Sequence, residues 1–140
     1  MKIQISHENT ESIEGFELVE TKYGLTQLEG IVDHSSEEIY IVDCIDKMNY
    51  DEATKLLTVA VQKLRLNGKL VVNGTDLNAC CQSVNNGQLN SKQFSQLIEQ
   101  TASLRTGKEV ENILRSFGLV IDTFALKGYT YDIKTIRQHN

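Results

Sequence analysis

The sequence contains no proline among its 140 residues. Average protein composition would give a chain of this length about seven prolines. Its turns must therefore be made by Gly, Asn, Asp and Ser, which tolerate turn conformations for physical reasons of their own.

Long apolar runs are also absent. No stretch approaches the roughly 18 apolar residues that a membrane span needs, and residues 1–5 lack the apolar core of a signal peptide. Dense runs of Lys and Arg are missing, and the net charge is −5, so nonspecific attraction to nucleic acid is disfavoured. We therefore expect a cytoplasmic protein that binds no membrane.

Cysteine is scarce, and its spacing suits no disulfide framework. The three cysteines are Cys44, Cys80 and Cys81, an odd number with two of them adjacent. No Cys-x-x-Cys or Cys/His spacing indicates zinc, so the sequence predicts free thiols and no metal site.

The apolar residues that are present, 40% of the total, suffice for the core of one domain, which we expect to span residues 1–140. The clearest unit begins at Asn49, a good helix N-cap. It continues as an amphipathic helix, a turn at Asn67 and Gly68, and a buried strand over 69–73. Gly68 is expected to provide the left-handed helix cap.

Other segments fit the same plan. Strands are predicted over 2–6, 16–20 and 38–43, and the four consecutive apolar residues 39–42 predict a strand with both faces covered. Helices are expected from Ser91 and from a Thr106–Glu109 capping box. A hairpin is expected from 119–125 and 129–136, whereas 78–90 is predicted to be irregular. The fold class predicted is α/β, a Rossmann-like, mostly parallel sheet with flanking helices and a C-terminal antiparallel hairpin.

Four short motifs in this order resemble those of compact class I S-adenosylmethionine (SAM)-dependent methyltransferases, in particular small predicted methyltransferases of bacteria and phages. The motifs are Ile13-Glu14-Gly15-Phe16, Glu38-Ile39-Tyr40, Leu64-Arg65-Leu66-Asn67-Gly68-Lys69-Leu70 and Thr75-Asp76-Leu77. With the order of the predicted elements, the resemblance spans nearly the whole chain.

The resemblance also implies a cofactor site. The family's glycine-rich loop matches residues 6–8, its ribose-binding acid matches Glu20, and its pocket-lining segment begins at Asp43 and continues to Asp46 and Lys47. The implied cofactor-binding positions are Ser6, His7, Glu8, Glu20, Asp43 and Cys44. No catalytic residue is assigned.

Three side chains replace the loop glycines that let the family's backbone approach the cofactor. Glu8 would repel the carboxylate of SAM. We therefore expect no cofactor and a degenerate, non-catalytic binding or structural module with a protein partner or self-association, part of an assembly such as a virion if phage-encoded. Two alternatives stay open: a divergent SAM-dependent methyltransferase with an altered loop, and a pocket for a different ligand. Glu20 and His7 could equally be solvated loop residues.

Overall fold

The computed structural model describes residues 1–8, 11–22 and 24–138, and they form a six-stranded sheet of order β2-β1-β3-β4-β6-β5. The strands are β1 (Lys2–Ser6), β2 (Glu17–Glu20), β3 (Ser36–Ile41), β4 (Leu64–Thr75), β5 (Val120–Lys127) and β6 (Thr130–Ile136). The pairs β2–β1, β1–β3 and β3–β4 are parallel, and β6 is antiparallel to both β4 and β5. This topology confirms the predicted fold class.

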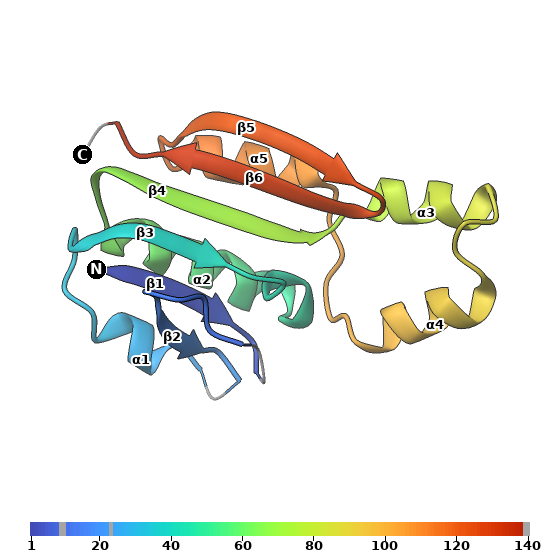
Figure 1. The fold of residues 1–140 in the computed structure, drawn as a ribbon, viewed down its shortest axis with the longest axis horizontal. Helices are drawn as coiled ribbons and strands as arrows, with labels where there is room; N and C mark the ends of the chain where they lie inside the picture. The colour runs from blue at the N-terminus through green and yellow to red at the C-terminus, as the bar shows by residue number, and fades with distance from the viewer. Residues whose placement is uncertain (9–10, 23, 139–140) are drawn as a thin grey trace.

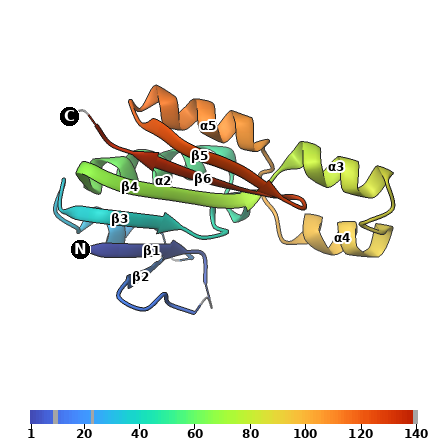
Figure 2. The ribbon, with the colours of Figure 1, turned by 45° about the horizontal axis from the view of Figure 1, so that its top comes forward.

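The helical elements are α1 (Thr26–Glu29), the 3-10 turn η1 (Ile45–Lys47), α2 (Tyr50–Lys63), α3 (Leu77–Asn85), α4 (Ser91–Glu99) and α5 (Gly107–Ser116). The helices that pack on the sheet lie on one of its faces. Figures 1 and 2 show α1, α2 and α5 behind the strands, with α3 and α4 projecting beyond one end of the sheet. We call the other side of the sheet the helix-free face.

Strand β3 shows the consequence of this one-sided arrangement. Ile39 and Ile41 point towards the helices and are fully buried, while Tyr40 and Val42 are only partly buried. The prediction that both faces of this strand are covered is therefore wrong for the side that carries Tyr40 and Val42, which is covered only in part. Tyr40 is instead partly covered by the ring of Phe16, whose centroid lies 4.9 Å from its own.

The helix α2 forms where the sequence predicted it. The Asn49 side chain accepts a hydrogen bond from the backbone N–H of Glu52, which satisfies one of the free donors at the helix start. Its apolar stripe packs into a core between the sheet and the helices. Fully buried members of that core include Ile3, Ile5, Leu56, Leu64, Leu70, Val72, Leu114 and Ile133.

The predicted cap at Gly68 is wrong. Helix α2 ends at Lys63, and the chain enters β4 directly at Leu64. Asn67, with a φ of 63°, adopts the left-handed conformation instead, which asparagine tolerates better than most residues. Gly68 is needed for space, because a Cβ there would lie 2.8 Å from the carbonyl oxygen of Arg65.

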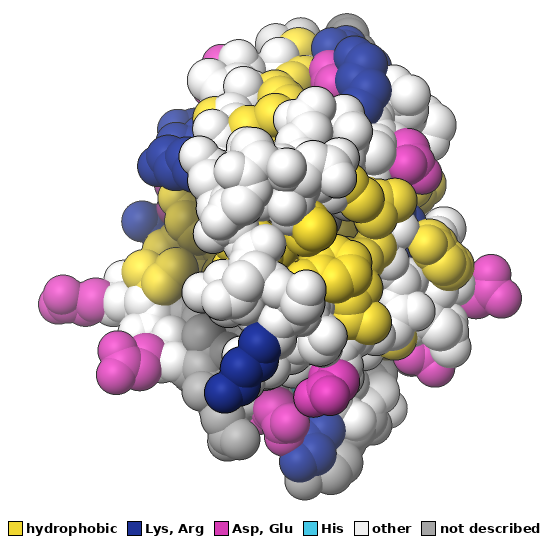
Figure 3. All heavy atoms as spheres, turned by 90° about the vertical axis from the view of Figure 1, so that its right-hand side faces the viewer, with side chains coloured by type: hydrophobic (Ala, Val, Ile, Leu, Met, Phe, Trp, Pro, Cys, Tyr) yellow, Lys and Arg dark blue, Asp and Glu magenta, His cyan; other side chains and the backbone are white. Residues whose placement is uncertain are grey.

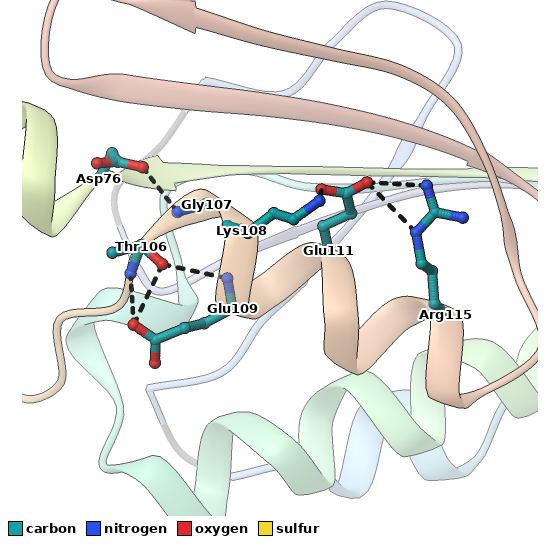
Figure 4. A network of polar contacts seen from close by, with 7 residues as sticks. All are labelled: Asp76, Thr106, Gly107, Lys108, Glu109, Glu111 and Arg115. Atoms are coloured by element: carbon teal, nitrogen blue, oxygen red, sulfur yellow. Dashed lines mark hydrogen bonds and ion pairs between the residues drawn. The ribbon is translucent and has the colours of Figure 1, made fainter.

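The capping box at the start of α5 is confirmed. Thr106 accepts from the N–H of Glu109, and the Glu109 carboxylate accepts from the N–H of Thr106 (Figure 4). Asp76 joins two helix starts, because its carboxylate accepts from the N–H groups of Ala79 in α3 and Gly107 in α5. Residues 78–85, which were predicted to be irregular, therefore belong to a helix, whereas 86–90 form an irregular turn as predicted.

Further along α5, the largely buried Glu111 carboxylate pairs with Lys108 at 3.0 Å and with Arg115 at 2.9 Å (Figure 4). Hydrogen bonds from Arg115 and Lys108 lower the pKa of Glu111. Across the described ranges, none of the helices has the length and apolar character that crossing a membrane would require.

Candidate functional site

The six positions implied by the resemblance lie at or just beyond the carboxyl ends of β1, β2 and β3. Ser6 and Cys44 are fully buried, whereas Glu20 and Asp43 are exposed. In open α/β sheets, ligands bind in the crevice at the carboxyl ends of strands where the strand order reverses. Here that point lies beside β1, the strand between β2 and β3.

Side chains from either side of β1 meet at this point. Thr21 follows β2 and Cys44 lies beyond the end of β3, and the Thr21 hydroxyl oxygen lies 3.2 Å from the Cys44 sulfur. The N–H of Thr21 also donates to the carbonyl oxygen of Ser6 at 2.9 Å. A direct contact therefore bridges the carboxyl end of β1.

The loop after β1 is held against β2. The Glu8 carboxylate pairs with the Lys22 ammonium, and the hydrogen bond from Lys22 lowers the pKa of Glu8, which keeps it ionised. The N–H of Lys22 donates to the carbonyl oxygen of His7 at 3.1 Å. Residue 8 therefore presents an ion-paired carboxylate at the position that the resemblance assigns to the cofactor loop.

One buried amide ties down the rest of the β1–β2 connection, which contains no helix in its described residues. The Gln4 Nε2 donates to the Ser6 hydroxyl and to the carbonyl oxygen of Glu11, and its Oε1 accepts from the N–H of Ile13 at 2.6 Å. Gln4 is 1% exposed. A single side chain thus secures the chain over the helix-free side of β1.

Burial raises the pKa of the Cys44 thiol to about 11. A nucleophilic cysteine needs a thiolate near neutral pH. Cys44 therefore packs as a neutral thiol against Thr21.

A small hollow of about 300 Å³ lies beyond the carboxyl end of β1, lined by His7, Glu8, Lys47 and Gln100. The His7 Nδ1 atom is buried and has no hydrogen-bond partner in the described ranges of the chain. This hollow is the place where one polar group of a ligand could meet the predicted loop residues.

A larger cavity of about 760 Å³ lies at the carboxyl ends of β3 and β4, beside the start of β6. We call it the main cavity. Tyr40, Val42 and Val71 of the helix-free face give it an apolar wall, and α4 contributes Leu97 and Gln100. Its volume lies within the range typical of small-molecule sites. Of the predicted cofactor positions, Asp43 lines it.

The most buried carboxylate of the main cavity belongs to Asp46, which is 3% exposed. Its Oδ2 accepts from the N–H of Thr75 at 2.8 Å. Desolvation raises the pKa of Asp46 to about 6, with Asp43 adding to the rise and the Thr75 N–H and Arg105 opposing it. Asp46 therefore changes charge near neutral pH.

Tyr131 lies across from Asp46 and is 1% exposed. Burial raises the pKa of its phenol well above the usual range, so the hydroxyl stays protonated. Its oxygen has no hydrogen-bond partner within the described ranges. Gly74 lies between the two groups: a Cβ there would be 2.8 Å from both the Asp46 Oδ1 and the Tyr131 hydroxyl oxygen.

The sequence analysis considered Asp46 but missed Gly74 and Tyr131. One signal was present, because a glycine inside a strand often marks a close approach of another group. Tyr131 could not be found in this way, because its position opposite Gly74 follows from the β4–β6 register. Among the described residues, no group of three or more His, Cys, Asp or Glu side chains is placed to hold a metal ion.

Apolar side chains gather at the end of the molecule formed by α3 and α4 (Figure 3). Leu77, Val84 and Ile98 are each more than a third exposed, and α4 buries none of its residues. Contiguous exposed apolar surface often marks a protein contact.

No protein-family model and no curated protein matches the sequence. Solved structures do match the fold. An O-methyltransferase family protein from Burkholderia thailandensis aligns at a TM-score of 0.62 and 14% identity, over 87% of this chain and 36% of that one. A SAM-dependent methyltransferase from Archaeoglobus fulgidus aligns at 0.65 and 12%, over 88% of this chain and 68% of that one.

A magnesium protoporphyrin IX methyltransferase from Synechocystis, solved with bound S-adenosylhomocysteine (SAH), aligns at a TM-score of 0.56 and 12% identity, over 87% of this chain and 50% of that one. The chain thus spans between about a third and two thirds of these structures. Such low identities establish the fold alone, which is that of class I methyltransferases.

Proposed function

We propose that residues 1–140 form one degenerate methyltransferase-like domain that functions as a non-catalytic binding or structural module. The contact between Thr21 and Cys44 carries this proposal, because it bridges the sheet edge where a cofactor of this fold would lie. In this view the chain keeps the framework of the fold and holds no SAM.

Electrostatics supports the same conclusion. Lys22 keeps Glu8 ionised and paired with it, so the carboxylate of SAM would meet a carboxylate and would gain no favourable charge contact there. The loop glycines that would relieve the steric conflict are replaced by Ser6, His7 and Glu8.

Isothermal titration with SAM tests the proposal. We expect no saturable heat at millimolar SAM, and saturable heat would overturn it. The variant Ser6→Gly/Glu8→Gly restores the glycine pattern of the family, and circular dichroism would verify its fold. Weak SAM binding gained by this variant would identify the loop as the main obstacle.

The alternative function is a divergent SAM-dependent methyltransferase with an altered loop. The unpartnered Nδ1 of His7 beside the small hollow favours it. In that case SAM would contact the predicted positions, and His7→Ala would lower its affinity. Glu14→Ala, a change at an exposed residue of the β1–β2 connection, is the matched control.

The proposed module also includes a protein partner or self-association, with a cytoplasmic or virion-associated location. The exposed apolar end at α3 and α4 is a suitable contact surface. Light scattering after size exclusion would measure self-association, and Ile98→Glu should reduce any that is found. If the chain is phage-encoded, neighbouring genes for virion assembly would support a structural role.

A further inference from the structure

The buried end of the main cavity contains a polar oxygen that the described part of the chain leaves without a hydrogen bond, the Tyr131 hydroxyl oxygen. Near it lies the buried Asp46 carboxylate, whose Oδ2 accepts from the Thr75 N–H. Buried polar groups are nearly always satisfied in folded proteins, so the Tyr131 oxygen requires an explanation.

Gly74 keeps the space beside the Tyr131 hydroxyl oxygen and the Asp46 Oδ1 free of a side chain, since a Cβ there would lie 2.8 Å from both. Glycine also weakens a strand interior. Its presence at this position is consistent with a bound group that needs that space.

Arg105, the cation that lowers the pKa of Asp46, makes its hydrogen bonds elsewhere. The Arg105 guanidinium donates to the Ser103 hydroxyl at 3.1 Å and to the Tyr50 carbonyl oxygen at 3.2 Å. It also lies over the Tyr50 ring, 4.4 Å from the centroid. Arg105 therefore lowers the pKa of Asp46 only at a distance, and the carboxylate has no direct cationic partner in the described ranges.

The charges that line the main cavity balance. Three are carboxylates and three are ammonium groups: Asp43, Asp46 and Asp132, with Lys47, Lys127 and Lys134. Lys47 pairs with Asp43 at 3.7 Å, whereas Lys127 and Lys134 have no ion-pair partner among the described residues. A ligand that suits this lining has no net charge but carries one positively and one negatively charged group.

We propose that the main cavity binds a small zwitterion, with a primary ammonium group between Asp46 and Tyr131 and an anionic group near Lys127 and Lys134. An ammonium group donates up to three hydrogen bonds, so it can satisfy the Tyr131 oxygen and also pair with the Asp46 carboxylate. A buried carboxylate gains more from a charged donor than from a neutral one. The inference gives a ligand class to the proposed binding module and rests on that proposal.

The ligand should bind more tightly as the pH rises through about 6, where Asp46 loses its proton. The ionisable groups that face Asp46 are Asp43, which precedes η1, Arg105, which precedes α5, and Tyr131 on β6. The first raises the pKa of Asp46 and the second lowers it. The phenol of Tyr131 stays neutral throughout this range.

Proton–nitrogen NMR spectra of the full chain, titrated with 6-aminohexanoate at pH 7.5, test the inference. We expect saturable shifts of the Gly74 and Thr75 amides. Hexanoate, which lacks the ammonium group, should give none, and hexylamine, which lacks the carboxylate, should bind more weakly. Absence of shifts with 6-aminohexanoate, or equal shifts with hexanoate, would overturn the inference.

Conservative variants separate binding from folding. Asp46→Asn keeps an acceptor for the Thr75 N–H, and Tyr131→Phe removes one oxygen. Loss of the charge should weaken binding about tenfold or more, and loss of the hydroxyl should weaken it less. Gly74→Ala should abolish binding, while Gly30→Ala, at a glycine whose added Cβ meets nothing nearer than 3.6 Å, should not change it.

SAM is titrated in the same series so that the two proposals fail separately. Shifts of the His7 and Glu8 amides with SAM would overturn the proposal that the domain binds no SAM, and would leave the proposal of a zwitterion site unaffected. No response to 6-aminohexanoate, with no response to SAM, would overturn the zwitterion site and leave the non-catalytic module standing.

Discussion

The crevice beside β1 and the main cavity at β3 and β4 lie along the same edge of one sheet. Thr21 and Cys44 meet across the first, whereas Gly74 contributes no side chain to the second. The difference shows that one or two residues just beyond each strand decide where this edge has space for a ligand. Similarity of fold to the methyltransferases cannot locate a site at that level of detail.

Charge distinguishes the same two regions. The crevice side carries Glu8 already neutralised by Lys22, so its charge is satisfied within the chain. The main cavity has Asp46 buried without a direct cationic partner in the described ranges. A ligand can therefore gain free energy from the cavity that it cannot gain from the crevice.

The largest expected effect is the pH dependence caused by Asp46. Its pKa is raised to about 6 by burial, so the folded state holds this proton more tightly than the unfolded chain. The free energy of unfolding should fall as pH rises from about 4 to about 6, by up to about 3 kcal/mol from this group. Asp46→Asn should remove that fall.

Urea unfolding at pH 4, 5, 6 and 7 measures this difference between wild type and variant. Asp122→Asn, on the edge strand β5, is the control for the loss of a charge. A difference between Asp46→Asn and wild type that stays constant over this pH range would contradict the buried carboxylate.

The second effect concerns the space at Gly74. Gly74→Ala should lower the free energy of unfolding by about 1–3 kcal/mol, because the added methyl group crowds Asp46 and Tyr131. Gly30→Ala, with a φ of −72° and room for a Cβ, should change stability by less than about 1 kcal/mol. Equal costs at the two glycines would remove the contrast between a position that a cavity requires to be glycine and an ordinary helix C-cap.

A smaller effect is expected at the crevice beside β1. Thr21→Val keeps the volume of the side chain and removes the hydroxyl contact with Cys44, which should cost at most about 1 kcal/mol. SAM should still fail to bind, because the side chains of residues 6–8 are unchanged. Thr123→Val on β5 is the exposed control; SAM binding by Thr21→Val alone would show that the hydroxyl contact itself excludes SAM.

The last test leaves stability unchanged and compares the three thiols. Iodoacetamide at pH 8 should label exposed Cys81 first, while buried Cys44, with its pKa raised to about 11, and buried Cys80 react slowly. Peptide mass spectrometry measures the rates, and in urea all three should react. Labelling of folded Cys44 as fast as Cys81 would mean that the contact between Thr21 and Cys44 opens readily in solution.

Local patterns in the sequence were sufficient for much of the fold. The Asn49 cap, the Thr106–Glu109 box and the strand over 2–6 all depend on neighbouring residues, and the structure confirms them. The helix-free face was not predictable in this way, because Tyr40 has the same apolar character whether a helix or the ring of Phe16 covers it.

The main cavity depends on long-range register. Gly74 and Tyr131 become neighbours only when β4 and β6 pair antiparallel, and Asp46 reaches them from the turn after β3. The resemblance pointed to the same sheet edge through Asp43 and Asp46. The roles assigned to Ser6, His7, Glu8, Glu20 and Cys44 stay predictions.

Gln4 has a consequence for how the sheet opens. Its amide acts as a surrogate peptide group, since it donates to the carbonyl oxygen of Glu11 and accepts from the N–H of Ile13. The edge strand β2 is bonded to β1 alone and over only four residue pairs. Strand β2 and the segment that the Gln4 side chain holds should therefore form one unit of low local stability. We expect the backbone amides of this unit to exchange with solvent hydrogen well before those of β4.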